Sequence, residues 1–74
     1  MEQKKNIRQI LASNLKRIRQ EKNLTIEELA KITELSQSFI SKVENCQKKR
    51  IYLSHIFIFS KALSINANDL LEED

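Results

Sequence analysis

Residues 25–44 read TIEELAKITELSQSFISKVE and predict two short helices separated by a break of three residues. Thr25 stands three positions before Glu28, the spacing of a capping box, in which each side chain accepts a hydrogen bond from the other residue's backbone N–H. Ser36 can cap the second helix in the usual way. Helices this short and this close cannot lie in line. We therefore expect a bent pair over about residues 25–44, a geometry that can place one helix in a DNA groove.

Further helices are expected on both sides of this pair. The segment from about Lys4 to Lys22 carries one apolar stripe with spacings of three and four, formed by Ile7, Ile10, Leu11, Leu15 and Ile18. A fourth helix is expected to begin near Leu53 or Ser54 and to end at Leu63, and a fifth to span Ala67 to about Leu71 behind the cap Asn66. No segment alternates as a strand does. The sequence predicts one compact, all-α, five-helix domain over residues 1–74.

Composition argues against several classes of function. The 74 residues include one cysteine, one histidine and no glycine, so they offer no disulfide, no zinc ligand set, and no glycine for a phosphate loop or a nucleophile elbow. We expect no enzyme activity, cofactor, metal or small-molecule ligand. No apolar run approaches a membrane span, and the first residues, Met1-Glu-Gln-Lys-Lys, do not resemble a signal peptide. The expected location is the cytoplasm, without a membrane partner.

The charge is distributed unevenly along the chain. Residues 1–50 carry twelve Lys or Arg against six acidic residues, whereas residues 51–74 carry one Lys against four acidic residues. An anionic polymer is attracted to the first part and repelled by the last. Charge alone is also consistent with an ordinary solvated surface, but here the basic part is the one that contains the helix pair.

The second helix of the pair has one exposed polar face if it packs through Ile40 and Val43. That face carries amide, hydroxyl and ammonium groups and no acid: Gln37, Ser38, Ser41 and Lys42, with Asn45 at its end. Such groups can pair with base edges in the major groove. Gln37 and Ser38 lie near the start of the helix, which penetrates deepest in this docking geometry. The alternative is a polar helix surface that is merely hydrated.

Several motifs together resemble the phage-repressor and Cro type of helix-turn-helix protein, also called the xenobiotic-response-element (XRE) family. The resemblance covers roughly residues 11–71 and rests on Leu15-Lys-Arg-Ile-Arg19, Leu24-Thr-Ile-Glu-Glu-Leu-Ala30, Ser36, Ile40-Ser-Lys-Val-Glu-Asn45, Ala62-Leu63-Ser-Ile65 and Asp69-Leu70. It implies a lambda-repressor-like domain that binds operator DNA as a two-fold dimer.

The resemblance also implies roles for individual residues. Arg19 and Glu44 are expected to form an ion pair, and base contacts are expected from Gln37, Ser38 and Lys42. Ser41 is added to these base contacts because it shares their helix face. Phosphate contacts are expected from Thr25, Asn45, Lys48, Lys49 and Arg50. The chain departs from the family pattern at four positions: Ile26, Glu34, Cys46 and Ile51. Glu34 and Cys46 replace glycines, so strained turns are expected at both.

The run Ile56-Phe57-Ile58-Phe59 predicts an exposed apolar surface, because a helix turns about 100° per residue and one buried face cannot accept four in a row. We expect Ile58 or Phe59 to point away from the core and, with Leu70 and Leu71, to form a dimer contact. The alternative is a single exposed isoleucine without a role.

These expectations favour a sequence-specific, double-stranded DNA-binding transcription regulator. It would act by occupying a pseudo-palindromic operator as a homodimer. The alternative from another class is an antitoxin-like protein-interaction module that uses the surface of the fourth helix.

Overall fold

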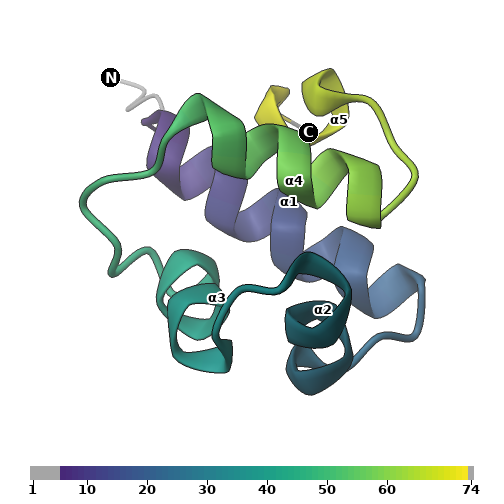
Figure 1. The fold of residues 1–74 in the computed structure, drawn as a ribbon. Helices are drawn as coiled ribbons and strands as arrows, with labels where there is room; N and C mark the ends of the chain where they lie inside the picture. The colour runs from purple at the N-terminus through teal and green to yellow at the C-terminus, as the bar shows by residue number, and fades with distance from the viewer. Residues whose placement is uncertain (1–5, 74) are drawn as a thin grey trace.

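The computed structural model describes residues 6–73 and contains five α-helices in this part of the chain, with no strand (Figure 1). The helices are α1 Ile7–Glu21, α2 Ile26–Thr33, α3 Gln37–Glu44, α4 Leu53–Ala62 and α5 Ala67–Leu71. The prediction of an all-α, five-helix fold is confirmed. The caps expected at Thr25 and Ser36 are present, and each accepts a hydrogen bond from the N–H three residues further on.

Helix α1 begins at Ile7, the first residue of the predicted apolar stripe. Asn6 has an extended backbone, with φ −77° and ψ 167°, and caps the helix. Its Oδ1 accepts a hydrogen bond from the Gln9 N–H at 2.9 Å, and its own N–H donates to Gln9 Oε1 at 3.0 Å. This capping box fixes the first helical residue at Ile7. The predicted start at Lys4 lies outside the described residues.

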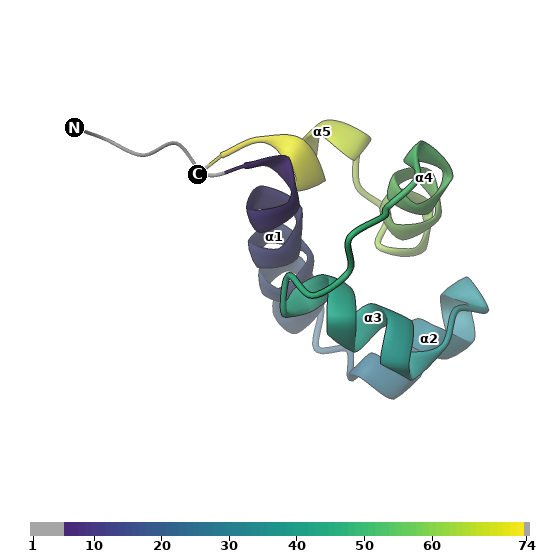
Figure 2. The ribbon, with the colours of Figure 1, turned by 90° about the vertical axis from the view of Figure 1, so that its left-hand side faces the viewer.

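The core lies between α1 and the other four helices. Helix α1 packs against α3 and α5, and α4 packs against α2 and α5. The side chains with the least exposure include Leu15, Leu29, Ile40, Val43, Phe59, Leu63 and Leu70. Helix α3 therefore packs through Ile40 and Val43, as predicted. Figures 1 and 2 show α3 at the lower edge of the molecule and α4 across the core from it.

The apolar run in α4 is oriented differently from the prediction. Ile56 and Phe59 lie three positions apart and face the core, with 6% and 0% exposure, whereas Phe57 is 55% exposed. Leu70 is fully buried, while Ile58 and Leu71 are half-buried. The prediction of a dimer contact is therefore wrong for Phe59 and Leu70, because both side chains are already enclosed by their own chain. The exposed apolar residues of α4 are Leu53 and Phe57 instead.

Within residues 6–73, four turns contain a residue with positive φ, and none of these residues is a glycine. They are Asn23, Glu34, Cys46 and Ser64, with φ of 58°, 62°, 58° and 56°. Strained turns were predicted at Glu34 and Cys46, and the left-handed residue at Ser64 was not predicted. The left-handed conformation costs an ordinary residue roughly 1–2 kcal/mol because Cβ approaches the following carbonyl oxygen.

Replacing Cys46 by glycine is therefore expected to raise the melting temperature by about 2–5 °C, since glycine removes this cost but gives the unfolded chain more freedom. Thermal unfolding followed by circular dichroism measures the shift. Cys46→Ala is the matched control, because alanine keeps the Cβ and should bring no gain. A melting temperature that is unchanged in Cys46→Gly would rule out strain at this turn.

Candidate nucleic-acid interface

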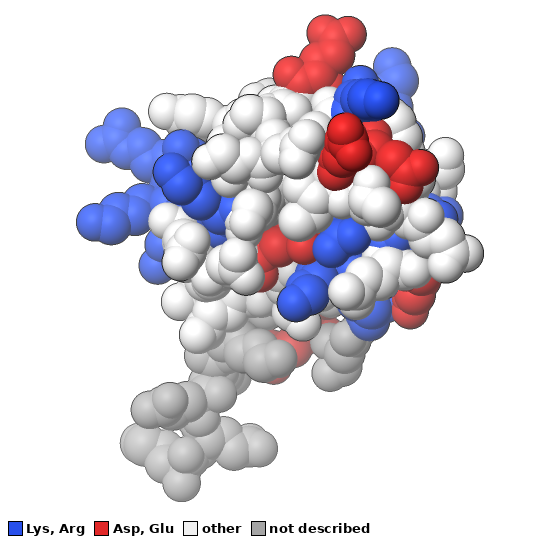
Figure 3. Space-filling view, turned by 90° about the horizontal axis from the view of Figure 1, so that it is seen from below, with Lys and Arg blue, Asp and Glu red and all other residues white. Residues whose placement is uncertain are grey.

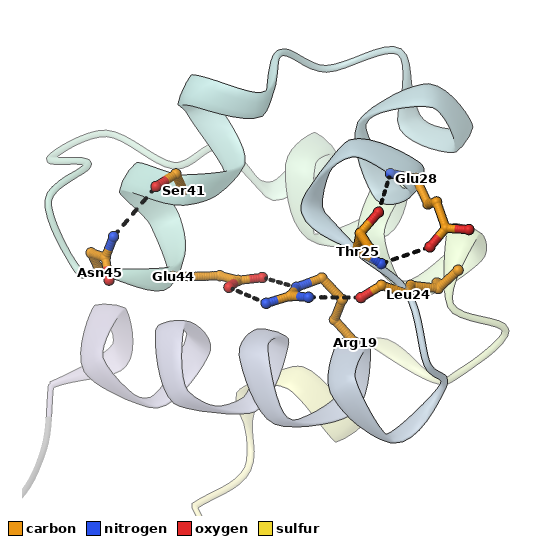
Figure 4. Close-up of polar contacts among 7 residues, drawn as sticks. All are labelled: Arg19, Leu24, Thr25, Glu28, Ser41, Glu44 and Asn45. Carbon is orange, nitrogen blue, oxygen red and sulfur yellow. Dashed lines mark hydrogen bonds and ion pairs between the residues drawn. The ribbon is translucent and has the colours of Figure 1, made fainter.

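The outer face of α3 is polar and free of acidic side chains. Gln37, Ser38 and Lys42 are exposed, Ser41 is half-buried, and Asn45 is exposed directly after the helix. Asn45 Nδ2 lies 3.4 Å from Ser41 Oγ, which orients the amide along the helix (Figure 4). The structure thus brings the five predicted side chains onto or next to one surface. Their amide, hydroxyl and ammonium groups are the groups that read base edges.

The one acidic residue in the second half of α3 points away from this face. Glu44 is 9% exposed and faces Arg19 of α1, which is 8% exposed. Arg19 Nε donates to Glu44 Oε2 at 2.6 Å and Nη2 donates to Oε1 at 3.0 Å, a bidentate pair (Figure 4). Nη1 donates to the Leu24 carbonyl at 2.7 Å. The predicted ion pair is present, and it joins α1, the turn before α2 and the end of α3.

This pair also neutralises a negative charge close to the polar face of α3.

 

The hydrogen bonds from Arg19 neutralise the Glu44 carboxylate, and the bond to Glu44 is also the main reason that the pKa of the Arg19 guanidinium is raised. A carboxylate that is paired in this way repels phosphate less than a free one does. The end of α3 can therefore approach a polyanion.

The start of α2 is held by the capping box that the sequence predicted. Thr25 Oγ1 accepts a hydrogen bond from the Glu28 N–H at 3.0 Å, and the Thr25 N–H donates to Glu28 Oε1 at 2.8 Å (Figure 4). The bond from the Thr25 N–H is the main cause that lowers the pKa of Glu28. Thr25 is exposed, and its hydroxyl proton can still be donated to a phosphate.

The lowered pKa of Glu28 gives a pH-dependent contribution to stability. The contribution is present above the ordinary value of 4.5 and is lost as the pH falls through the lower folded-state pKa. Glu28→Gln is expected to lower the melting temperature at pH 7, and this difference from the wild type should disappear at a pH well below 4.5, where the carboxylate is protonated in both states. Glu27→Gln is the control, since Glu27 lies in the same turn but accepts no hydrogen bond from Thr25. A difference that is the same at both pH values would contradict the expected role of the carboxylate.

The loop between α3 and α4 supplies the predicted basic residues. Lys49 and Arg50 are exposed and Lys48 is half-buried. In Figure 3, which views the molecule from the side of α2 and α3, Lys and Arg side chains gather at the left edge, where Figure 1 shows this loop. The loop follows α3 directly. Its cations therefore lie beside the polar face of that helix rather than at a separate site.

The sequence did not predict a set of contacts around Phe39. Its ring lies next to His55 of α4 and beneath the ammonium group of Lys48. No spacing along the chain points to this set, because the residues come from three separate segments. Within residues 6–73 there is no cluster of three or more metal-ligating side chains, and no helix in that range is long and apolar enough to cross a membrane.

The bent helix pair and the exposed face of α3 define a helix-turn-helix DNA-binding domain. Residues 14–73 match the Cro/C1-type helix-turn-helix DNA-binding domain family. The chain belongs to this family and is a DNA-binding transcriptional regulator. The resemblance seen in the sequence is thereby confirmed.

Two solved structures and one curated relative are similar to this chain. Control protein C.SmaI from Serratia marcescens is 36% identical over 66 residues, which cover 89% of this chain and 77% of that protein. The structure of the hypothetical transcription factor NHTF from Neisseria is 32% identical, with a TM-score of 0.86 over 97% of this chain and 84% of that one. The restriction-modification controller protein C.AhdI from Aeromonas hydrophila is 28% identical, with a TM-score of 0.80 over 85% of this chain and 94% of that one.

Proposed function

We propose that this chain controls transcription by occupying a two-fold symmetric operator as a homodimer. The observation that carries the proposal is the acid-free outer face of α3, which Ile40, Val43 and the Arg19–Glu44 pair hold rigidly from behind. A rigid helix with exposed hydrogen-bonding groups can read base edges in the major groove. The relatives C.SmaI and C.AhdI, described as control proteins, support a role in regulating a promoter.

Base reading is assigned to α3. Gln37 and Ser38 in its first turn enter the groove first, and Ser41 and Lys42 follow one turn later. Gln pairs best with adenine and Lys with guanine, while Ser accepts several partners. These four side chains set the preferred sequence of each half-site.

Backbone binding is assigned to groups around α3. Thr25 at the start of α2, Asn45 after α3, and the three basic residues Lys48, Lys49 and Arg50 hold phosphates. Contacts with phosphate fix the register of the protein on the duplex but carry no base preference. Each neutralised phosphate releases counterions, so binding weakens steeply with salt.

Dimerisation is assigned to the outer side of α4. Leu53 and Phe57 lie four positions apart and are 64% and 55% exposed, with the half-buried Ile58 beside them. Exposed apolar side chains grouped on one helix face are typical of a protein contact. Because α4 lies across the core from α3, a partner there leaves the base-reading face free (Figure 2). Two copies can then place their α3 helices about 34 Å apart, in successive major grooves.

Selection of bound duplexes from a random DNA pool tests the proposal as a whole. We expect a two-fold motif whose half-sites are separated by about one helical turn. Enrichment of a single asymmetric half-site would contradict the homodimer. Failure to enrich any sequence would contradict base reading by α3.

The division between base readers and phosphate contacts predicts different effects for two lysines. Lys42→Ala is expected to relax the preference at one base position, a loss of roughly 1–3 kcal/mol of discrimination. Lys49→Ala should weaken all duplexes evenly and reduce the slope of log K against log salt by about 1. Binding titrations at several salt concentrations, on the selected site and its single-base variants, measure both. Identical behaviour of the two variants would show that the division is wrong.

A further inference from the structure

The loop that carries the basic residues is attached to α3 through an aromatic ring. Lys48 Nζ lies 5.3 Å from the centroid of the Phe39 ring, a distance at which an ammonium group is attracted to the ring face. Phe39 is half-buried and packs against the core, so its ring is a fixed surface. An ammonium group has three protons, and those that point away from the ring remain available to a phosphate.

His55 holds the same ring from α4. The two ring centroids are 4.7 Å apart, and the planes are inclined by 51°. His55 is also 5.7 Å from the Tyr52 ring, and its Nδ1 accepts a hydrogen bond from the Tyr52 N–H at 3.1 Å. That bond caps the start of α4 where the loop ends. One histidine thus joins the end of the basic loop to the first turn of α3.

The loop backbone has a further contact with α1. Arg8 Nη1 lies 3.5 Å from the Lys48 carbonyl oxygen, at the long limit for a hydrogen bond. No proline restricts the loop. Beyond the backbone hydrogen bonds that tie Cys46 and Gln47 to the end of α3, the position of the loop depends on these side-chain contacts.

We propose that Phe39 and His55 are positioning residues for DNA binding, which hold Lys48 and its basic neighbours at a fixed place beside the base-reading face. This inference rests on the proposed phosphate role of the loop. A loop that is already ordered does not lose conformational freedom on binding, and the share of molecules competent to bind stays high. Without the ring, the same cations are present, but they must be ordered when DNA binds.

The contact itself can be tested without DNA. The ring current of Phe39 should shift the ε-methylene resonances of Lys48 upfield in the NMR spectrum of the free protein. Phe39→Leu keeps an apolar side chain of similar size and should remove this shift, whereas Phe39→Tyr should retain it. Lys48 resonances that are the same in the wild type and in Phe39→Leu would overturn the inference.

The consequence for binding is measured on a duplex of random sequence, since phosphate contacts do not depend on the bases. Phe39→Leu is expected to weaken binding roughly three- to fivefold with an unchanged salt slope, because the cations still reach phosphate once bound. Lys48→Ala should weaken binding and reduce the slope by about 0.9. The double variant should lose less than the product of the two single losses, because both act on one contact. Phe39→Tyr should bind as the wild type does.

If Phe39→Leu unfolds, His55→Gln is a second variant that tests the positioning role. Glutamine at this third helical position can still accept the Tyr52 N–H, so α4 keeps its cap while the ring contact is lost. Weaker binding with an unchanged slope supports the inference, and wild-type affinity of the folded variant overturns it. If Lys48→Ala weakens binding while Phe39→Leu does not, the phosphate role stands and the positioning role fails. If Lys48→Ala changes neither affinity nor slope, both fail.

Discussion

Replacing Arg19 by methionine is expected to destabilise the domain by about 3 kcal/mol and to lower its melting temperature by roughly 15 °C. Methionine removes three donors: two to the Glu44 carboxylate and one to the Leu24 carbonyl. Glu44, which is 9% exposed, is then left as an almost buried charge without a partner. Thermal unfolding measures the loss. DNA binding should fall as well, because the end of α3 is no longer fixed to α1.

Two further variants show whether the loss of the Arg19–Glu44 ion pair causes this destabilisation. Arg19→Met combined with Glu44→Leu should recover most of the stability, since exchanging both partners for apolar side chains leaves no buried charge. Glu21→Gln breaks the exposed pair between Arg17 and Glu21 on the same helix and should change stability by less than about 1 kcal/mol. A loss in Arg19→Met no larger than that of Glu21→Gln would contradict the structural role of the buried pair.

Replacing Phe57 by glutamate is expected to produce monomers and to weaken operator binding by roughly a hundredfold or more, because the second half-site no longer binds as part of the same molecule. The side chain is 55% exposed in the single chain, so the variant should still fold, and its melting temperature should fall only by what dimerisation contributes. Sedimentation velocity measures the oligomeric state, and titration of the selected duplex measures the affinity.

Ile7→Glu is the matched control for this variant. Ile7 is 56% exposed at the start of α1 and does not belong to the exposed apolar face of α4 formed by Leu53 and Phe57. The Ile7→Glu variant makes the same change from an apolar to an acidic side chain and should leave the dimer intact. If Phe57→Glu stays dimeric, the proposed contact on α4 is wrong, and the exposed apolar residues there serve some other protein contact.

The sequence predicted best those features that depend on neighbouring residues. The cap at Thr25 and the cap at Ser36 each act within one turn, so the boundaries of α2 and α3 followed from the local pattern. The apolar stripe shows which face of α1 is buried but not where the helix is capped. The Asn6–Gln9 capping box decides that point.

Features that depend on distant segments were harder to predict. Any of the residues in the run 56–59 could face inward by sequence alone, and the packing of α4 against α2 and α5 selects Ile56 and Phe59. The contact of Phe39 with Lys48 and His55 joins α3, a loop and α4. No periodicity connects residues of three segments, so only the folded chain shows that they meet.

The four left-handed residues have a consequence for the lifetime of the protein. Each of them follows a different helix: Asn23, Glu34, Cys46 and Ser64. Because the positions are separate, the gains in stability from replacing each residue by glycine should add. A small domain with little stability to spare opens more often and offers proteases more chances to cut it. A combined glycine variant is therefore expected to persist longer in cells, while the side chains on the outer face of α3 stay the same.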